Sequence, residues 1–231
     1  MSAREVAFES IDVAASESGL TQLRQLGARN VPVVAKGRGY VSGQNLREVN
    51  AFLGLDEVSA DILPPDELVG RLDTVLSAAQ RYLRQMPDDQ MAEHLPGRPR
   101  TYRELTHHVF QITRAFLGVT AGGELSYDSL VEAPRDALIT FADIAGHGET
   151  ARQGLLEWWA VAGVDADFDA TIETYYGSQT LHETLERTTW HTAQHVRQLL
   201  FVLEGLNIAA DGPLIERDLA GLPLPKEVWD G

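Results

Sequence analysis

Residues 190–199 read WHTAQHVRQL and lie within a long helical pattern in the second half of the chain. Residues 180–183, TLHE, match a capping box and predict the first turn of that helix. Gly205 predicts its end. His191 and His195 stand four residues apart, so a helix places both imidazoles on one face. This spacing allows the two side chains to share one metal ion.

An earlier helix offers a third imidazole. Residues 101–104, TYRE, form another capping-box match and predict a helix start. His108 lies three residues after Leu105 and four before Ile112, on the apolar face of that helix. His107 falls among the polar residues and is expected to face away. The expected metal ligands are therefore His108, His191 and His195.

Three neutral imidazoles leave open positions on a divalent ion, as catalytic zinc sites do. Zinc is the first expectation, and nickel, iron and copper also accept imidazole ligands. The alternative is that buried histidines hydrogen-bond to carbonyl groups or to Gln194 and Gln198. We expect His94, His147 and His182 to be exposed to solvent.

From Asp66 onward the apolar residues recur mostly at helical spacing. Pro134 fits the first turn of a third helix, which Gly146 and Gly148 are expected to interrupt. Residues 208–231 are rich in proline and predict an irregular tail. Four main helices joined by loops indicate a bundle.

The first 57 residues follow a different, β-α-β-β-α pattern. The expected elements are a strand at 6–13, a helix at 16–26, strands at 31–35 and 40–42, and a helix that Gln44 or Asn45 caps and that runs to Leu53. The expected fold class is therefore α+β, with a small unit at 1–57 and a helical bundle at 66–231.

The composition excludes several classes of protein. Lys and Arg number 19 against 34 Asp and Glu, a net charge of −15, which argues against nucleic-acid and anionic membrane surfaces as partners. The chain has no cysteine, so disulfides, thiolate metal ligands and cysteine nucleophiles are absent. The N-terminus lacks the apolar run of a signal peptide, so the expected location is the cytoplasm.

Residues 101–109 and 190–199 resemble the two signature helices of the DinB-like superfamily. Its members include thiol S-transferases and mycothiol-dependent maleylpyruvate isomerases. The resemblance spans residues 66–205 and implies an up-and-down four-helix bundle with a three-histidine metal site. Position by position it selects His108, His191 and His195, although isomerase-like members can carry Glu at the place of His191.

Residues 8–13, 26–34 and 39–45 resemble the latter part of a glutaredoxin. The resemblance implies a cis peptide bond between Val31 and Pro32, and a thiol-binding site at Val31, Pro32, Ser42, Gly43 and Asn45. The first strand, the CxxC turn and the first helix of a glutaredoxin have no counterpart here. Thiol–disulfide exchange is therefore excluded, and the alternative is that this unit only docks or dimerises.

These features predict a metal-dependent enzyme that uses a low-molecular-weight thiol on a small-molecule substrate, as an S-transferase or a thiol-dependent isomerase or lyase. The alternatives are a non-enzymatic, dimerising metal-binding stress protein and a thiol-independent metal hydrolase. Glu104, Glu183 and Glu186 are candidate outer partners of the metal-binding histidines. Arg187 and Arg197 either clamp a substrate carboxylate or face solvent.

Overall fold

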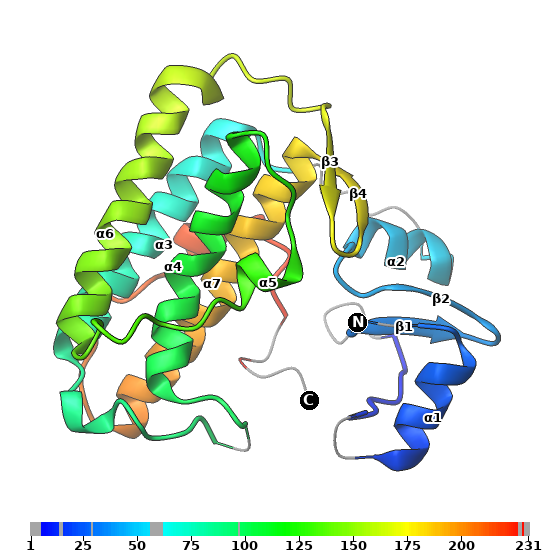
Figure 1. The fold of residues 1–231 in the computed structure, drawn as a ribbon, viewed down its shortest axis with the longest axis horizontal. Helices are drawn as coiled ribbons and strands as arrows, with labels where there is room; N and C mark the ends of the chain where they lie inside the picture. The colour runs from blue at the N-terminus through cyan, green and yellow to red at the C-terminus, as the bar shows by residue number, and fades with distance from the viewer. Residues whose placement is uncertain are drawn as a thin grey trace. The chain divides into compact units, whose positions relative to one another are not determined.

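The structure is a computed structural model of the 231-residue chain, described for residues 6–13, 16–28, 30–55, 62–96, 98–225 and 228. The chain divides into two compact units, residues 1–61 with 230–231, and residues 62–229. The boundary expected at residue 57 lies outside the described residues. The described part is mixed, with many helices and two small antiparallel sheets (Figure 1).

The first unit contains two helices and one hairpin. Its elements are α1 (Glu17–Gln25), β1 (Val33–Lys36), β2 (Gly39–Ser42) and α2 (Leu46–Leu53). The Ser16 side chain accepts a hydrogen bond from the Gly19 amide and so caps α1. The two strands pair antiparallel, with Val33 opposite Ser42. Gly37, at φ 65°, supplies the left-handed position that the turn between them requires.

The strand expected at residues 6–13 is wrong. Residues 6–12 carry no regular structure, and β1 pairs only with β2 in the part of the chain that the structure describes. A β-prone run becomes a strand only where a neighbour takes up its backbone hydrogen bonds, and the sequence pattern cannot show that neighbour. The Val31–Pro32 peptide is cis, as predicted.

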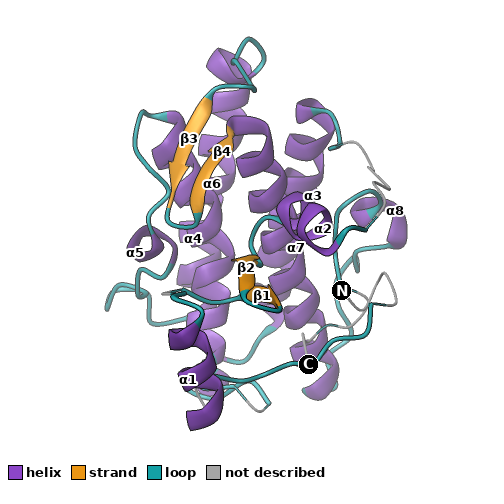
Figure 2. Ribbon diagram, turned by 90° about the vertical axis from the view of Figure 1, so that its right-hand side faces the viewer, coloured by secondary structure: helices purple, strands orange, loops and turns teal. Residues whose placement is uncertain are grey.

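The second unit is built on helices (Figure 2). Its elements are α3 (Pro65–Gln85), η2 (Asp88–Gln90), α4 (Tyr102–Thr120), α5 (Tyr127–Leu130), α6 (Phe141–Trp158), η3 (Trp159–Gly163), β3 (Thr171–Thr174), β4 (Gly177–Thr180), α7 (Leu181–Gly205) and α8 (Glu216–Leu219). Both expected capping boxes form, at Thr101 for α4 and at Thr180 for α7. In the expected irregular tail at 208–231, the described residues form one single-turn helix, α8.

Four long helices of this unit pack around a shared apolar core. Helix α3 packs against α6 and α7, and α4 packs against the same two helices. Their fully buried side chains include Leu72, Leu76, Tyr82, Phe110 and Phe116. Burial of each such side chain contributes about 1.5–3 kcal/mol relative to exposure to water, so this core is the main source of stability. None of the described helices is long and apolar enough to span a bilayer.

The four long helices do not alternate in direction, which corrects the up-and-down order that the DinB-like resemblance implies. Arg152 of α6 pairs with Asp73 of α3 at 2.6 Å, and Gln80 donates to Glu149, so α3 and α6 run antiparallel. Residues 110 and 117 of α4 lie against residues 148 and 154 of α6, so these two helices run parallel. The connection over residues 121–140 returns the chain to the end from which α4 started, as parallel neighbours require.

The third long helix starts later than expected and is not interrupted. Thr140 accepts from the Asp143 amide and caps α6, whereas Pro134 lies in the preceding loop. Gly148 sits inside the helix because a Cβ there would overlap the Phe110 ring. Close helix packing, and not a break, accounts for that glycine.

A hairpin that the sequence pattern did not predict joins α6 to α7. Strands β3 and β4 pair antiparallel, with Thr171 opposite Thr180. Gly177, at φ 120°, follows the turn residues Tyr175 and Tyr176. The hairpin brings both tyrosines to Arg187 on α7.

Candidate metal centre

His108 from α4 and His191 and His195 from α7 meet in the second unit. One ring nitrogen from each lies within 4.8 Å of those of the other two. Ring centroids are 4.9 Å apart for His108 and His195, 5.4 Å for His108 and His191, and 4.9 Å for His191 and His195. The structure thus brings together the three residues that the sequence selects, hereafter the histidine cluster.

Outer hydrogen bonds orient two of the rings. His108 Nδ1 lies 2.9 Å from the Leu130 carbonyl oxygen, which can only accept, so Nδ1 carries the proton and Nε2 keeps its lone pair. His195 Nδ1 lies 2.8 Å from Gln198 Oε1. The Gln198 amide group donates to the Val228 carbonyl at 3.4 Å, which orients Oε1 towards the ring. Both Nε2 atoms are therefore available as ligands.

The third ring completes a donor set that fits a divalent ion. His191 Nε2 is 3.1 Å from His195 Nε2. Two nitrogens bound tetrahedrally to zinc at about 2.0–2.1 Å lie roughly 3.3 Å apart, so this separation suits a shared ion. His191 Nδ1 is buried and has no hydrogen-bond partner among the described residues. The three imidazoles fit zinc by donor type and by the spacing of their nitrogens.

Burial keeps the cluster neutral. It lowers the pKa of His108 and of His191 well below the usual 6.5, and that of His195 to about 4. The positive charges of Arg100 and Arg187 lower the pKa of His191 and His195 further. Metal ions bind the neutral imidazole, so at neutral pH protons compete only weakly for the site.

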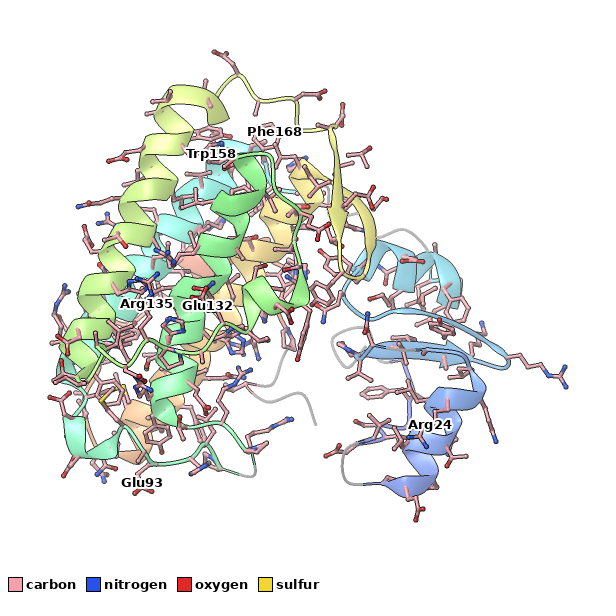
Figure 3. All side chains as sticks on the ribbon, viewed as in Figure 1. Arg24, Glu93, Glu132, Arg135, Trp158 and Phe168 are labelled. Atoms are coloured by element: carbon pink, nitrogen blue, oxygen red, sulfur yellow. The ribbon has the colours of Figure 1, made fainter. Side chains whose placement is uncertain are left out.

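His107 lies on the polar face of α4 and outside the histidine cluster, as predicted, but it is buried. The connection after α5 covers this side of α4. Arg103 donates to the Arg135 carbonyl at 2.8 Å, and Gln111 donates to Glu132 at 3.2 Å. Figure 3 shows Glu132 and Arg135 on that connection. The polar face of α4 is therefore an internal contact surface, which helical phase alone does not show.

The remaining histidines divide into one exposed residue and two partly buried ones. His94 is exposed, as predicted. His147 is half-buried and stacks on His107 at 5.8 Å between ring centroids. His182 is half-buried, with Nε2 2.9 Å from the Leu63 carbonyl oxygen. The expectation of exposure was wrong for both, since each packs against a segment distant in sequence.

Two of the carboxylates expected beside the cluster serve as helix caps. Glu104 accepts from the Thr101 amide at 2.7 Å, and Glu183 accepts from the Thr180 amide at 2.8 Å. The outer partners that orient the rings are instead a backbone carbonyl and a glutamine. Gln198 lies three residues after His195 on the same helix face, so its position was visible in the sequence. The Leu130 carbonyl carried no sequence signal.

The two arginines that flank the pair on α7 differ in their surroundings. Arg197 donates to Gln194 Oε1 at 2.8 Å and to the Pro225 carbonyl at 2.7 Å, so it holds the C-terminal segment. Arg187 is buried one turn before His191. Of these two arginines, Arg187 is the one whose charge lowers the pKa of His191 and His195.

The residues expected to bind a thiol meet at one corner of the first unit. The Pro32 carbonyl accepts from the Gly43 amide at 2.8 Å. Ser42 Oγ accepts from the Gln44 amide at 3.2 Å, and Asn45 Oδ1 accepts from the first turn of α2. Val31 is 50% exposed, and its backbone makes no hydrogen bond within the described ranges. Ser42 and Asn45 therefore stabilise the local fold, whereas the Val31 backbone has no hydrogen-bond partner among the described residues.

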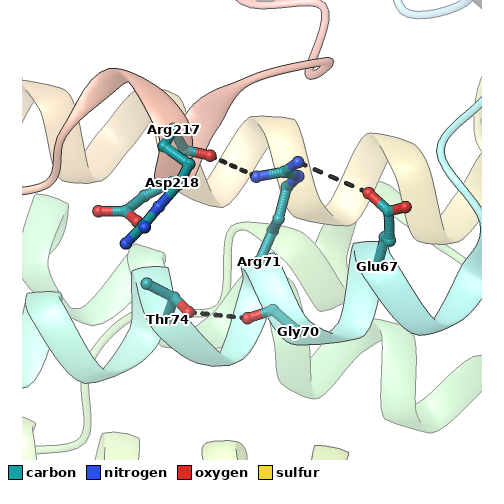
Figure 4. Close-up of a pocket in the computed structure, with 6 residues that line it drawn as sticks. All are labelled: Glu67, Gly70, Arg71, Thr74, Arg217 and Asp218. Atoms are coloured by element: carbon teal, nitrogen blue, oxygen red, sulfur yellow. Dashed lines mark hydrogen bonds and ion pairs between the residues drawn. The ribbon is translucent and has the colours of Figure 1, made fainter.

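A pocket elsewhere in the second unit belongs to the attachment of the C-terminal segment (Figure 4). Arg71 of α3 donates to the Arg217 carbonyl of α8 at 2.6 Å and pairs with Glu67 at 3.6 Å. The pocket is lined by Glu67, Gly70, Arg71, Thr74, Arg217 and Asp218. None of them belongs to the histidine cluster.

No protein-family model matches the chain, and no curated protein is significantly similar to it. The interpretation of the site therefore depends on its donor set, its geometry and its electrostatics.

Proposed function

We propose that this protein is a metal-dependent enzyme that uses a low-molecular-weight thiol, as an S-transferase or a thiol-dependent isomerase or lyase. In this proposal the second unit is a DinB-like bundle and the first is a truncated glutaredoxin-like unit. The observation that carries the proposal is the convergence of three neutral imidazoles from two helices. Two of their Nδ1 atoms are engaged by outer hydrogen bonds, which leaves Nε2 for the metal.

When bound, a zinc ion would lower the pKa of a thiol or water and polarise a substrate carbonyl. The histidine cluster would hold the ion. The Leu130 carbonyl and Gln198 keep the rings in one tautomer and one orientation. The chain contains no cysteine, so a sulfur nucleophile has to come from a separate molecule. These features favour a free thiol as co-substrate or cofactor.

The first unit supports the thiol part of the proposal through Val31. Among the described residues its backbone groups make no hydrogen bond, so they can pair with an extended, peptide-like thiol through β-type hydrogen bonds. Gly43 keeps the adjacent corner open, because a Cβ there would lie 3.2 Å from the Pro32 side chain and carbonyl. Gly43→Val in the full chain is expected to weaken saturation by the thiol and to leave the metal content unchanged.

The test is elemental analysis of the purified chain, followed by consumption of a thiol with an electrophile by zinc-loaded and metal-free protein. We expect one metal ion per chain, and turnover that requires both the metal and the thiol. Turnover of an ester without any thiol would replace the proposal by a metal hydrolase. Stoichiometric metal without turnover of either kind would indicate a sequestering protein.

A further inference from the structure

The C-terminal segment is attached to the second unit well before it reaches the metal centre. Arg81 of α3 donates to the Asp211 and Gly212 carbonyls at 3.1 and 2.9 Å. Leu222 is buried in the apolar core. The part of the segment that follows, residues 222–225 and 228, is hereafter the C-terminal strap.

Helix α7 binds the C-terminal strap at two backbone carbonyls. Arg197 donates to the Pro225 carbonyl at 2.7 Å, and Gln194 donates to the Val228 carbonyl at 2.7 Å. Gln198 donates to the same Val228 carbonyl at 3.4 Å. A carbonyl oxygen has two lone pairs, so it can accept from both glutamines at once.

The hydrogen bonds between the strap and the cluster have a fixed direction. Arg197 can only donate, and it donates to Gln194 Oε1 at 2.8 Å, so the Gln194 amide nitrogen faces the Val228 carbonyl. That carbonyl can only accept, so Gln198 presents its amide nitrogen to it and its Oε1 to His195 Nδ1. The proton of His195 is then on Nδ1, and Nε2 keeps the lone pair that a metal ion binds.

Without the Val228 carbonyl, the orientation of the Gln198 amide would no longer be fixed. Rotation by half a turn exchanges its oxygen and its nitrogen and leaves its shape almost unchanged, so packing does not choose between the two states. In the rotated state the amide nitrogen donates to His195 Nδ1, and the proton of the ring has to lie on Nε2. That tautomer cannot bind a metal ion through Nε2.

We propose that the C-terminal strap belongs to the metal centre, with the Val228 carbonyl as the positioning group that selects, through Gln198, the metal-binding tautomer of His195. This inference rests on the proposed function only in that a metal ion binds to the histidine cluster. The strap and the ion favour the same tautomer, so each strengthens the binding of the other by the same factor. Metal binding is thereby coupled to the docking of the C-terminus.

The experiment compares four forms of the protein: the native chain, a chain that ends at Pro225, a chain that ends at Trp229, and the full-length variant Arg197→Met. The chain that ends at Trp229 is the matched control, because it is shortened but keeps the Val228 carbonyl. Nitrogen-15 NMR of the metal-free protein reports the tautomer of His195, assigned with a His195→Ala variant. Competition against a chromophoric chelator measures zinc affinity, and urea unfolding measures stability.

We expect the native chain and the chain that ends at Trp229 to hold His195 with its proton on Nδ1. The chain that ends at Pro225 should show a mixture of tautomers and bind zinc about three- to tenfold more weakly, which is the effect of one ordinary hydrogen bond. Arg197→Met should change both quantities in the same direction by less, because both glutamines still reach Val228. If the chain that ends at Pro225 does not fold, the comparison with Arg197→Met decides.

The coupling can also be measured from the side of the C-terminus. A serine carboxypeptidase, which needs no metal, is added to the native chain, and mass spectrometry follows the release of Val228. Zinc should slow that release by a factor similar to the one by which the strap raises zinc affinity. An unchanged rate at saturating zinc would contradict the coupling.

The outcomes separate this inference from the proposed function. If no zinc binds but the His195 tautomer still depends on Val228, the positioning role stands and the metal-dependent function fails. If zinc binds equally well to both shortened chains and the tautomer is the same in both, the inference is refuted and the metal-dependent function stands. A loss of zinc affinity with an unchanged tautomer also overturns the inference, because the strap would then act on stability alone.

Discussion

The hydrogen bond between Gln198 and His195 offers a direct test of how the metal centre is organised. Gln198→Leu keeps the approximate volume of the side chain and removes the acceptor that lies 2.8 Å from His195 Nδ1. Without it the ring can adopt the other tautomer, which places the proton on Nε2, where the metal would bind. The variant should therefore bind metal more weakly while folding normally.

The expected magnitude follows from the role of Gln198 as an outer partner. Loss of such a partner typically weakens metal affinity by about 10–100-fold, which corresponds to roughly 1.4–2.7 kcal/mol. Gln198 also donates to Val228 at 3.4 Å, and loss of that bond should cost stability by about 1 kcal/mol or less. The two effects can be separated because they are measured by different experiments.

The assay is competition for zinc against a chromophoric chelator, with urea unfolding of the metal-free protein alongside. Gln194→Leu is the matched control, because Gln194 lies on the same helix and donates to the Val228 carbonyl at 2.7 Å. Gln194→Leu also removes a glutamine and its hydrogen bond to the Val228 carbonyl, but it keeps the hydrogen bond between Gln198 and His195. If Gln198→Leu weakens zinc binding no more than Gln194→Leu does, Gln198 does not orient His195 and the argument fails.

Three further predictions address the cluster, its titration and its scaffold. His191→Ala should lose most of the bound metal in elemental analysis, whereas His107→Ala, outside the histidine cluster, should keep it; full metal in His191→Ala would contradict the site. Stability of the metal-free protein should fall as pH drops from about 6.5 towards 4, and urea midpoints across this range measure it. The reason is that the folded state holds His107 and His195 at a pKa of about 4, so the unfolded chain binds more protons in that window; a flat profile would show that these rings titrate normally. Gly148→Ala should lower the midpoint of thermal unfolding, at a cost of about 1–3 kcal/mol, because its Cβ would overlap the Phe110 ring. Gly146→Ala on the same helix has open space and should stabilise by up to about 1 kcal/mol, so equal effects of the two changes would refute the packing argument.

Local features of the sequence determined the helices and the identity of the three clustered histidines. The capping boxes at Thr101 and Thr180 begin α4 and α7, because a cap depends on residues within one turn of each other. The spacing of His191 and His195 and the helical phase of His108 place their side chains by the same short-range geometry.

Elements that depend on distant partners could not be predicted in this way. The run at residues 6–13 has the composition of a strand but forms no strand. Helix α6 was expected to start near Pro134, whereas it starts directly after Thr140. The direction of α6 depends on its contacts with α3 and α4, which no periodicity along one helix encodes.

Tertiary structure alone decided the electrostatics and the outer contacts of the site. The Leu130 carbonyl orients His108 although the two residues are 22 positions apart in the chain. The connection after α5 packs against the face of α4 that carries His107, and this residue is therefore buried. Sequence spacing reports which side chains share a helix face, whereas burial, tautomer and pKa depend on which remote segments pack against that face.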